Sequence, residues 1–244
     1  MDGLEGRPTA NGRLSIGMQL PPLHVLYEDN HLLAVSKPAG LPTMGVAAVL
    51  PSLLSLAKQY IKERYHKPGN VYLGAMSRLD APVTGVVLFA RTSKAASRLT
   101  EQFRSRAVDK AYWAIVAGEP PAQASCVDWL AKDERHRRMH LSAAGQAGAQ
   151  EARLSYRRLI RLPRHWSLEI ALETGRKHQI RLQLAERGFP ILGDRKYGSQ
   201  APFPSGIALH ARRLGFTHPT QDVPIELTAP LPKSWRQFGF REPS

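Results

Sequence analysis

The order of the predicted elements constrains the fold of this chain most, because strand-like segments occur in runs with only a few helices between them. Strands are predicted at 24–27, 31–35, 86–90, 110–116, 153–162, 166–173, 209–216 and 223–227. Helices are predicted at 52–65, 93–106 and 176–187. This order predicts an α+β fold with a mixed, mostly antiparallel sheet and argues against a doubly wound parallel sheet.

Local signals place the ends of these elements. Ser52 and Ser93 are the expected N-caps of the first two helices, because a serine hydroxyl accepts a hydrogen bond from a free amide of the first turn. Gly188 is expected to end the third helix. The polar and basic segment 132–140 is predicted to be a loop.

Length and composition bound the class of protein. The 244 residues, 43% of them hydrophobic, suit one large domain or two lobes around a shared core, and we expect a flexible leader over 1–23 and a folded domain over 24–240. No apolar run is long enough to cross a bilayer, and the N-terminus has no secretory signal pattern. Cys126, the only cysteine, forms neither an internal disulfide nor a zinc cluster. These features predict a cytoplasmic protein.

The charge balance indicates a polyanionic partner. Lysine and arginine number 34 and aspartate and glutamate 20, so the formal net charge is +14. A basic surface attracts nucleic acid, because each phosphate contact releases counterions. The alternative is that the charge only favours solubility.

Three segments carry candidate chemistry, and the first is 77–85. Asp80 stands in a predicted turn directly before an apolar strand, where it is held rigidly and stays accessible. Pro82 restricts the preceding residue to extended conformations, and Gly85 permits a bend or a close approach. The alternative is a carboxylate that only caps the turn.

The second segment, 173–181, joins a predicted strand to a predicted helix. A helix start offers free amides and a positive dipole, which suit a phosphate. Lys177, His178 and Arg181 are neighbours on the predicted helix, and Arg181 is expected to require a carboxylate partner because it lies close to core positions. The alternative is a basic helix surface in solvent.

The third segment is the predicted strand around Tyr112. Lys110 and Tyr112 point to the same side of this strand, so a base stacked on the ring would have a cation near its phosphate. The alternative is a core aromatic with a lysine extending past it to solvent.

In this order the three segments resemble the three motifs of the RluA-type family of RNA pseudouridine synthases. The resemblance extends to the Lys-Pro-x-Gly turn in 31–40, the Gly-Asp-x-x-Tyr-Gly element at 193–198 and the closing strands around 209–219. It covers about residues 24–232, nearly the whole chain.

The resemblance implies a fold, a reaction and a set of residues. The family's fold is a mixed sheet in two lobes with a basic RNA-binding cleft, so 24–240 would be the catalytic domain. Asp80 matches the essential aspartate, Tyr112 the active-site tyrosine, Arg181 the arginine that pairs with the aspartate, and Arg78 an arginine that holds the flipped nucleotide. The further expected substrate contacts are Lys110, Arg176, Lys177 and His178.

The reaction explains these residue types. The uridine must leave the base stack, and an ionised Asp80 would either attack the anomeric carbon or remove a ribose proton; the sequence leaves both routes open. Arg181 would favour the charged form of the aspartate. Tyr112 would stack on the freed uracil and accept the C5 proton, directly or through water. An isomerisation of this kind requires no cofactor and no metal, and none is expected.

The sequence departs from the family pattern at supporting positions. Ser77, Val83 and Thr84 replace the usual His, Thr and Ser, which bears on target preference and packing more than on chemistry. Residues 1–23 are too short for the S4-type RNA-binding module of many members, so RNA binding is expected to fall on the catalytic cleft and its loops. The segment 132–140 is a candidate RNA contact; its alternative is a solvated charge run.

The expected function is therefore isomerisation of uridines in ribosomal or transfer RNA by a monomer without a membrane or an obligate protein partner. An RNA-binding or chaperone-like protein with the same fold is the main alternative, and it would predict damaged catalytic positions. A glycoside hydrolase and a DNA-binding regulator fit less well, because a paired carboxylate is not evident and no helix-turn-helix or zinc-finger pattern occurs. His136 and His140 have metal-ligand spacing without an evident third ligand.

Overall fold

The computed structural model describes residues 22–45, 47, 50–136 and 138–242, so the expected leader over 1–23 lies almost entirely outside the described residues. The described strands are β1 His24–Glu28, β2 Leu32–Lys37, β3 Gly74–Ala75, β4 Thr84–Ala90, β5 Asp109–Val116, β6 Gln123–Asp133, β7 Arg138–Ser142, β8 Gln150–Arg161, β9 Trp166–Leu172, β10 Leu209–Thr217 and β11 Pro224–Thr228. The helices are α1 Leu53–Arg64, α2 Ser93–Arg104, α3 Gln179–Ala185 and α4 Lys233–Gln237, with a 3-10 turn, η1, at Arg195–Tyr197.

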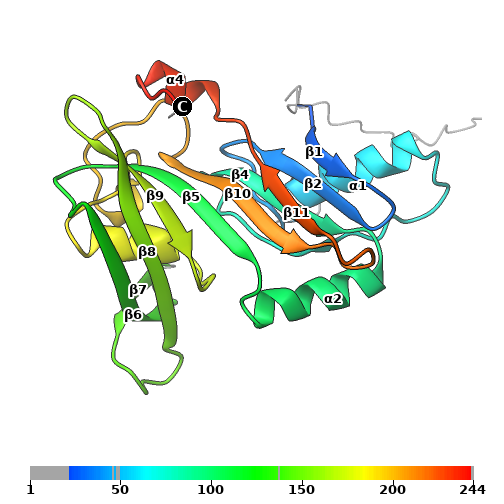
Figure 1. Ribbon diagram of the computed structural model, residues 1–244, viewed down its shortest axis with the longest axis horizontal. Coiled ribbons are helices and arrows are strands. Elements are labelled where there is room, and N and C mark those ends of the chain that lie inside the picture. The colour runs from blue at the N-terminus through cyan, green and yellow to red at the C-terminus, as the bar shows by residue number, and fades with distance from the viewer. Residues whose placement is uncertain (1–21, 46, 48–49, 137, 243–244) are drawn as a thin grey trace, which may run out of the picture.

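All the described strands belong to one sheet, in the order β1-β2-β4-β10-β5-β9-β8-β6-β7, with β11 beside β10 and β3 beside β4. The sheet divides into two halves in Figure 1, and the ladder between β10 and β5 joins them. The β4–β10 pair is parallel and the other pairs are antiparallel. The prediction of an α+β fold with a mixed, mostly antiparallel sheet is therefore confirmed.

The apolar sequence of β4 follows from burial on both faces. Val87 and Phe89 face the cluster that contains Leu53 of α1, whereas Val86 and Leu88 belong to the cluster that contains residues of α2. Every residue of this strand is buried, so a continuous apolar run takes the place of alternation.

Gly85 makes the parallel contact between β4 and β10 possible. It has a positive φ of 117°, and it lies opposite Ala211 in the β10 ladder. A Cβ at this position would lie 2.2 Å from the Ala211 carbonyl oxygen. The expected close approach at Gly85 is therefore an approach of backbone to backbone.

Three local predictions are wrong in detail. Thr92, and not Ser93, caps α2, because its hydroxyl accepts from the amide of Ala95. The segment 132–140 is not one loop: β6 and β7 pair through it and leave only a short turn. The third helix begins at Gln179 and not at 176, because His178 adopts a left-handed conformation that a helix cannot include. Ser52 does cap α1.

Candidate active site

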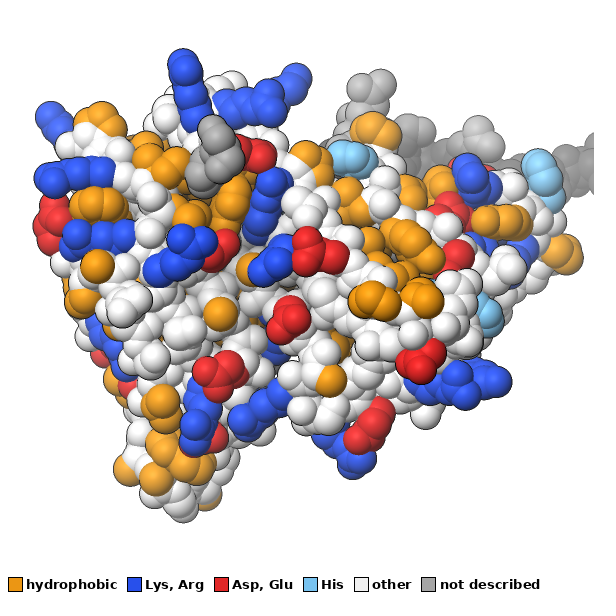
Figure 2. All heavy atoms as spheres, in the orientation of Figure 1, with side chains coloured by type: hydrophobic (Ala, Val, Ile, Leu, Met, Phe, Trp, Pro, Cys, Tyr) orange, Lys and Arg blue, Asp and Glu red, His pale blue; other side chains and the backbone are white. Residues whose placement is uncertain are grey.

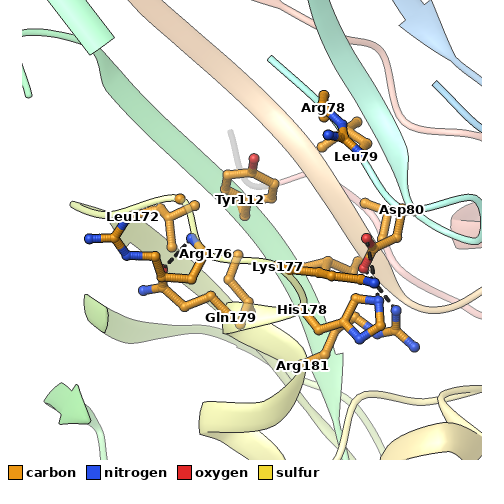
Figure 3. A pocket seen from close by; sticks show the side chains of 14 residues that line it. Arg78, Leu79, Asp80, Tyr112, Leu172, Arg176, Lys177, His178, Gln179 and Arg181 are labelled. Carbon is orange, nitrogen blue, oxygen red and sulfur yellow. Dashed lines mark hydrogen bonds and ion pairs between the residues drawn. The ribbon is translucent and has the colours of Figure 1, made fainter. Parts of the chain in front are cut away.

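A cavity of about 310 Å³ crosses the middle of the sheet, where the turn before β4 faces the segment that leads into α3. This volume is within the range of roughly 300–1,000 Å³ that small-molecule sites occupy. Seven of the eight predicted site residues line it, as Figure 3 shows: Arg78, Asp80, Tyr112, Arg176, Lys177, His178 and Arg181. The structure therefore brings the three candidate segments together, although Lys110 is not among the lining residues.

The Asp80 turn is fixed mainly through its backbone. The amide of Val83 donates to the carbonyl of Asp80, which closes the turn. The neighbouring Ala81 carbonyl accepts from the amide of Gly40 and from Nζ of Lys37, at 2.8 and 2.9 Å. The Asp80 side chain is then left free to point into the cavity, with 26% of its surface exposed.

Arg181 connects two carboxylates. Its Nη1 donates to Oδ2 of Asp80 at 2.8 Å, and its Nε and Nη2 donate to the two oxygens of Asp194 at 2.7 and 2.8 Å. Burial opposes the charge of Arg181, but the hydrogen bonds to Asp194 and Asp80 raise the pKa of its guanidinium, so Arg181 stays charged. The sequence-based expectation that Arg181 pairs with a carboxylate is confirmed, and two carboxylates supply it.

His178 forms the other side of the Asp80 environment. Its Nε2 lies 3.7 Å from Oδ1 of Asp80, and its Nδ1 lies 2.7 Å from the hydroxyl of Tyr197. Burial lowers the pKa of His178 from 6.5 to about 4, despite the opposing effect of Asp80, so the imidazole is neutral near pH 7.

Tyr112 provides an aromatic wall from β5. Figure 3 shows its ring across the cavity from Asp80, and Leu172 and Leu209 add apolar surface. Desolvation and the negative charge of Asp80 raise the pKa of Tyr112 above its usual 10, so the phenol is neutral at physiological pH. An aromatic ring with apolar neighbours and a carboxylate opposite suits a flat polar base.

The predicted cationic residues differ in their freedom. Arg78 and Lys177 are exposed at the cavity. Arg176 donates from Nε to the Glu151 carbonyl at 2.9 Å, and Lys110 donates to the Glu173 carbonyl at 3.3 Å. Arg78 and Lys177 are consequently the cations best able to follow a ligand, while Arg176 is oriented by the protein.

Two residues near the site, Asp194 and Tyr197, belong to the Gly-Asp-x-x-Tyr-Gly element, but the sequence alone assigns them no role. Asp194 is 2% exposed and neutralises Arg181, and Tyr197 contacts both His178 and, at 5.1 Å, the Arg181 guanidinium. Their membership of the Gly-Asp-x-x-Tyr-Gly element was the available signal. Periodicity alone could not find them, because Asp194 precedes a single 3-10 turn and Tyr197 is the last residue of that turn.

The departures from the family pattern are accommodated locally. The Ser77 hydroxyl accepts from the Leu88 amide at 3.1 Å, and the Thr84 hydroxyl lies 2.8 Å from Nδ1 of the buried His210. Val83 packs in the core. Ser77 and Thr84 therefore support β4, whereas Val83 also lines the cavity around Asp80.

A second cavity, of about 520 Å³, lies among β5, β6, β8, β9 and β10. Small side chains line much of it. Of its three ionic residues, Arg157 and Glu169 bond to each other at 2.7 Å, and Arg213 pairs with Glu226 at 2.9 Å. Figure 2 shows the face over β8 and β9 with acidic and basic side chains interspersed. The charged side chains that line this second cavity are therefore paired within the protein, and the cavity around Asp80 is the better candidate site.

The part of the chain that the structure describes contains no cluster of three or more histidine, cysteine or acidic residues suited to a metal. Within the same residues, no helix has the length and apolarity needed to span a bilayer.

Comparisons with known proteins identify the family to which this fold belongs. Residues 31–186 match the family model described as RNA pseudouridylate synthase. The chain is 36% identical to the ribosomal large subunit pseudouridine synthase D of Xanthomonas campestris pv. campestris, over 91% of this chain and 71% of the relative. It is 30% identical to the tRNA pseudouridine synthase C of Vibrio cholerae, over 90% of this chain and 97% of the relative.

A solved structure agrees with this assignment. The human RNA pseudouridylate synthase domain containing 4 superposes with a TM-score of 0.74 at 25% identity, covering 91% of this chain and 95% of the human chain. The chain therefore belongs to the RNA pseudouridylate synthase family, of the RluA type, and it is an isomerase.

Proposed function

We propose that this protein isomerises uridines in structured ribosomal or transfer RNA to pseudouridine, with Asp80 as the catalytic carboxylate at a flipped-out nucleotide. The observation that carries the proposal is the convergence of Asp80, Tyr112 and Arg181 on one cavity from segments far apart in the chain. The names of the relatives from Xanthomonas campestris and Vibrio cholerae supply the two classes of RNA.

The proposed reaction breaks the bond between ribose C1′ and uracil N1 and forms a bond between C1′ and C5. The C5 proton leaves, N1 gains a proton, and no atom or electron is gained or lost overall. Asp80 faces the ribose, either as nucleophile at C1′ or as the base that removes a ribose proton. Arg181 holds Oδ2 at 2.8 Å and stabilises the carboxylate in both cases.

The detached uracil must stay in the cavity while it turns. The Tyr112 ring and the Leu172 and Leu209 side chains provide a surface on which a flat ring can rotate. Because the Tyr112 phenol is neutral, its oxygen is too weak a base to keep the C5 proton; it would instead accept a hydrogen bond from a water that takes this proton and passes it to solvent. Arg78 is exposed beside the cavity and is suited to the phosphate or base of the extruded nucleotide.

The expected outcome at Asp80 is a loss of turnover without a loss of RNA binding. Transcripts of ribosomal and transfer RNA carrying tritium at uridine C5 would be incubated with wild type and Asp80→Asn, and tritium release measured beside filter binding. Asp80→Asn keeps the shape of the side chain and removes its charge, so release should fall at least about 10³-fold, as for other essential catalytic groups.

Asp128→Asn is the matched control, because it makes the same change at an aspartate that pairs with Arg187 at 2.9 Å outside the cavity. It should retain release. Equal release from wild type and Asp80→Asn would refute the role of Asp80. Binding by the wild type without release from either RNA would favour the alternative, an RNA-binding protein with little turnover.

A further inference from the structure

The imidazole of His178 lies between two side chains, and each of them faces one of its ring nitrogens. It precedes α3 with a φ of 53°, which directs its imidazole between Asp80 and Tyr197. Nδ1 is 2.7 Å from the Tyr197 hydroxyl, and Nε2 is 3.7 Å from Oδ1 of Asp80. A neutral imidazole carries one N–H, so only one of these contacts can receive a proton from the ring.

The hydrogen bonds of the Tyr197 hydroxyl determine which ring nitrogen of His178 carries the proton. The amide of Met139 in β7 donates to the Tyr197 oxygen at 3.1 Å, so this oxygen already accepts one hydrogen bond. Tyr197 is 8% exposed, and among the described residues its hydroxyl contacts only the Met139 amide and Nδ1 of His178. The Tyr197 hydroxyl satisfies its own proton by donating to Nδ1, which must then be unprotonated.

The Asp80 side favours the same arrangement. With Nδ1 as acceptor, the N–H of the ring is on Nε2 and faces the carboxylate oxygen. The other tautomer would direct a nitrogen lone pair at Oδ1, which is repulsive. The separation of 3.7 Å is longer than a direct hydrogen bond, and catalytic contacts of this kind shorten when substrate closes the site.

We propose that His178 is a positioning residue for Asp80, and that the Tyr197 hydroxyl fixes its imidazole in the tautomer whose Nε2–H faces Oδ1. Arg181 holds Oδ2 and His178 orients Oδ1, so the plane of the Asp80 carboxylate is fixed relative to the ribose. The burial that lowers the pKa of His178 keeps the ring neutral and able to act in this way. The inference rests on the proposed function, because it assigns a role relative to Asp80.

The tautomer can be measured without turnover. In protein labelled with ¹⁵N-histidine, the two ring nitrogens of His178 give distinct shifts according to which is protonated. At pH 7 the expected result is a neutral ring with the proton on Nε2, and a perturbed Nδ1 shift in Tyr197→Phe. A proton on Nδ1, an imidazolium, or an Nδ1 signal that Tyr197→Phe leaves unchanged would overturn the proposal.

The kinetic test uses His178→Asn. Asparagine adopts the left-handed backbone readily, and its short amide occupies the Nδ1 side without reaching Asp80. Losing a hydrogen bond to a charged group should lower kcat for tritium release roughly 10-fold, with KM for RNA changed less than about two-fold. An unchanged kcat, or a change in KM alone, would overturn the positioning role.

Tyr197→Phe should lower kcat in the same direction, because the ring of His178 loses its orienting partner. Tyr60→Phe is the matched control: its hydroxyl bonds to Glu28 at 2.8 Å, outside the residues that line the cavity, and kcat should not change. If Asp80→Asn is inactive while His178→Asn and Tyr197→Phe both match wild type, only this inference fails. If Asp80→Asn stays active, the proposed function fails whatever tautomer is found.

Discussion

Asp80 and Asp194 both pair with Arg181, and they differ in how far their side chains are exposed to solvent. Asp194 is 2% exposed and takes two hydrogen bonds from the guanidinium, so it compensates the buried charge. Asp80 takes one, and its side chain is 26% exposed. A buried ion pair offsets its desolvation cost only when the geometry satisfies the remaining donors. Asp194 meets that requirement, which leaves Asp80 held from one side and open to a substrate on the other.

Lys37 is a second buried cation, and it lies directly behind this turn. It is 1% exposed, and its Nζ donates to the carbonyls of Pro38, Leu41 and Ala81 at 2.7–2.9 Å. Desolvation lowers the pKa of Lys37 from 10.5 to about 7, although Asp80 acts in the opposite direction. The bond to Ala81 ties this lysine to the residue that follows Asp80.

The lowered pKa of Lys37 predicts how stability changes with pH. Between pH 7 and 10.5 the unfolded chain binds a proton that the folded chain does not, so the free energy of unfolding gains up to about 1.4 kcal/mol per pH unit from this residue. Lys37→Met removes the titrating group. The stability of wild type relative to Lys37→Met should therefore rise from pH 7 to pH 10 in urea denaturation. A constant difference would contradict the lowered pKa.

At the scale of elements, the sequence predicted those whose signals are local. The apolar run of β4 and the cap Ser52 of α1 specify their own structure. The start of α3 was missed because residues 176–178 have helical composition, whereas the left-handed His178 is set by contacts with Tyr197 and Asp80. The β6–β7 hairpin was missed because charged side chains along it obscured the alternation.

The β4–β10 contact depends on the absence of a side chain at Gly85. Gly85→Ala would place a methyl group 2.2 Å from the Ala211 carbonyl oxygen at a φ of 117°, so strain and overpacking together should cost roughly 2–5 kcal/mol. Gly69→Ala is the control, because its Cβ would meet no atom within 4 Å and its φ is not in the positive range. Urea midpoints would measure both. Similar midpoints for the two variants would show that the strands separate without strain.

We propose that the hairpin formed by β6 and β7 contacts the RNA backbone. Arg135 and Arg138 are exposed there; Arg137, the third arginine of the predicted contact, lies outside the described residues. Replacing Arg135 and Arg138 with Gln should flatten the slope of log binding constant against log salt by roughly 1.4–1.8, if each contacts one phosphate.

The control for the hairpin is the double change Lys58→Gln and Lys62→Gln. These lysines are exposed on α1, which lies beside the other half of the sheet (Figure 1). The two substitutions remove the same total charge as the two in the hairpin. Their salt slope should match that of wild type. If the hairpin variant has the same salt slope as wild type, Arg135 and Arg138 do not contact the RNA.

The whole molecule brings together what local patterns cannot relate. Asp80 and Arg181 are 101 positions apart and bond directly, and the β10–β5 ladder joins the two halves of the sheet and brings Tyr112 to the same cavity. Nothing in the periodicity of any one segment requires that meeting, because it follows from the order of strands. The order of several motifs along the chain did predict it, through the resemblance to a family whose sheet has this arrangement.

The position of this cavity makes a prediction about RNA structure. Its residues surround a space of about 310 Å³, and in the proposed function a uridine leaves its base stack to enter this space and meet Asp80. Extrusion costs a few kcal/mol from a duplex and less from a loop. For a stem–loop that the enzyme modifies, moving the same uridine from loop to stem should lower kcat/KM for tritium release roughly 10- to 100-fold. Affinity should change little, because the phosphates are retained. Equal rates from loop and stem would mean that extrusion does not limit the reaction, and a loss of affinity equal to the loss of rate would place the discrimination in binding.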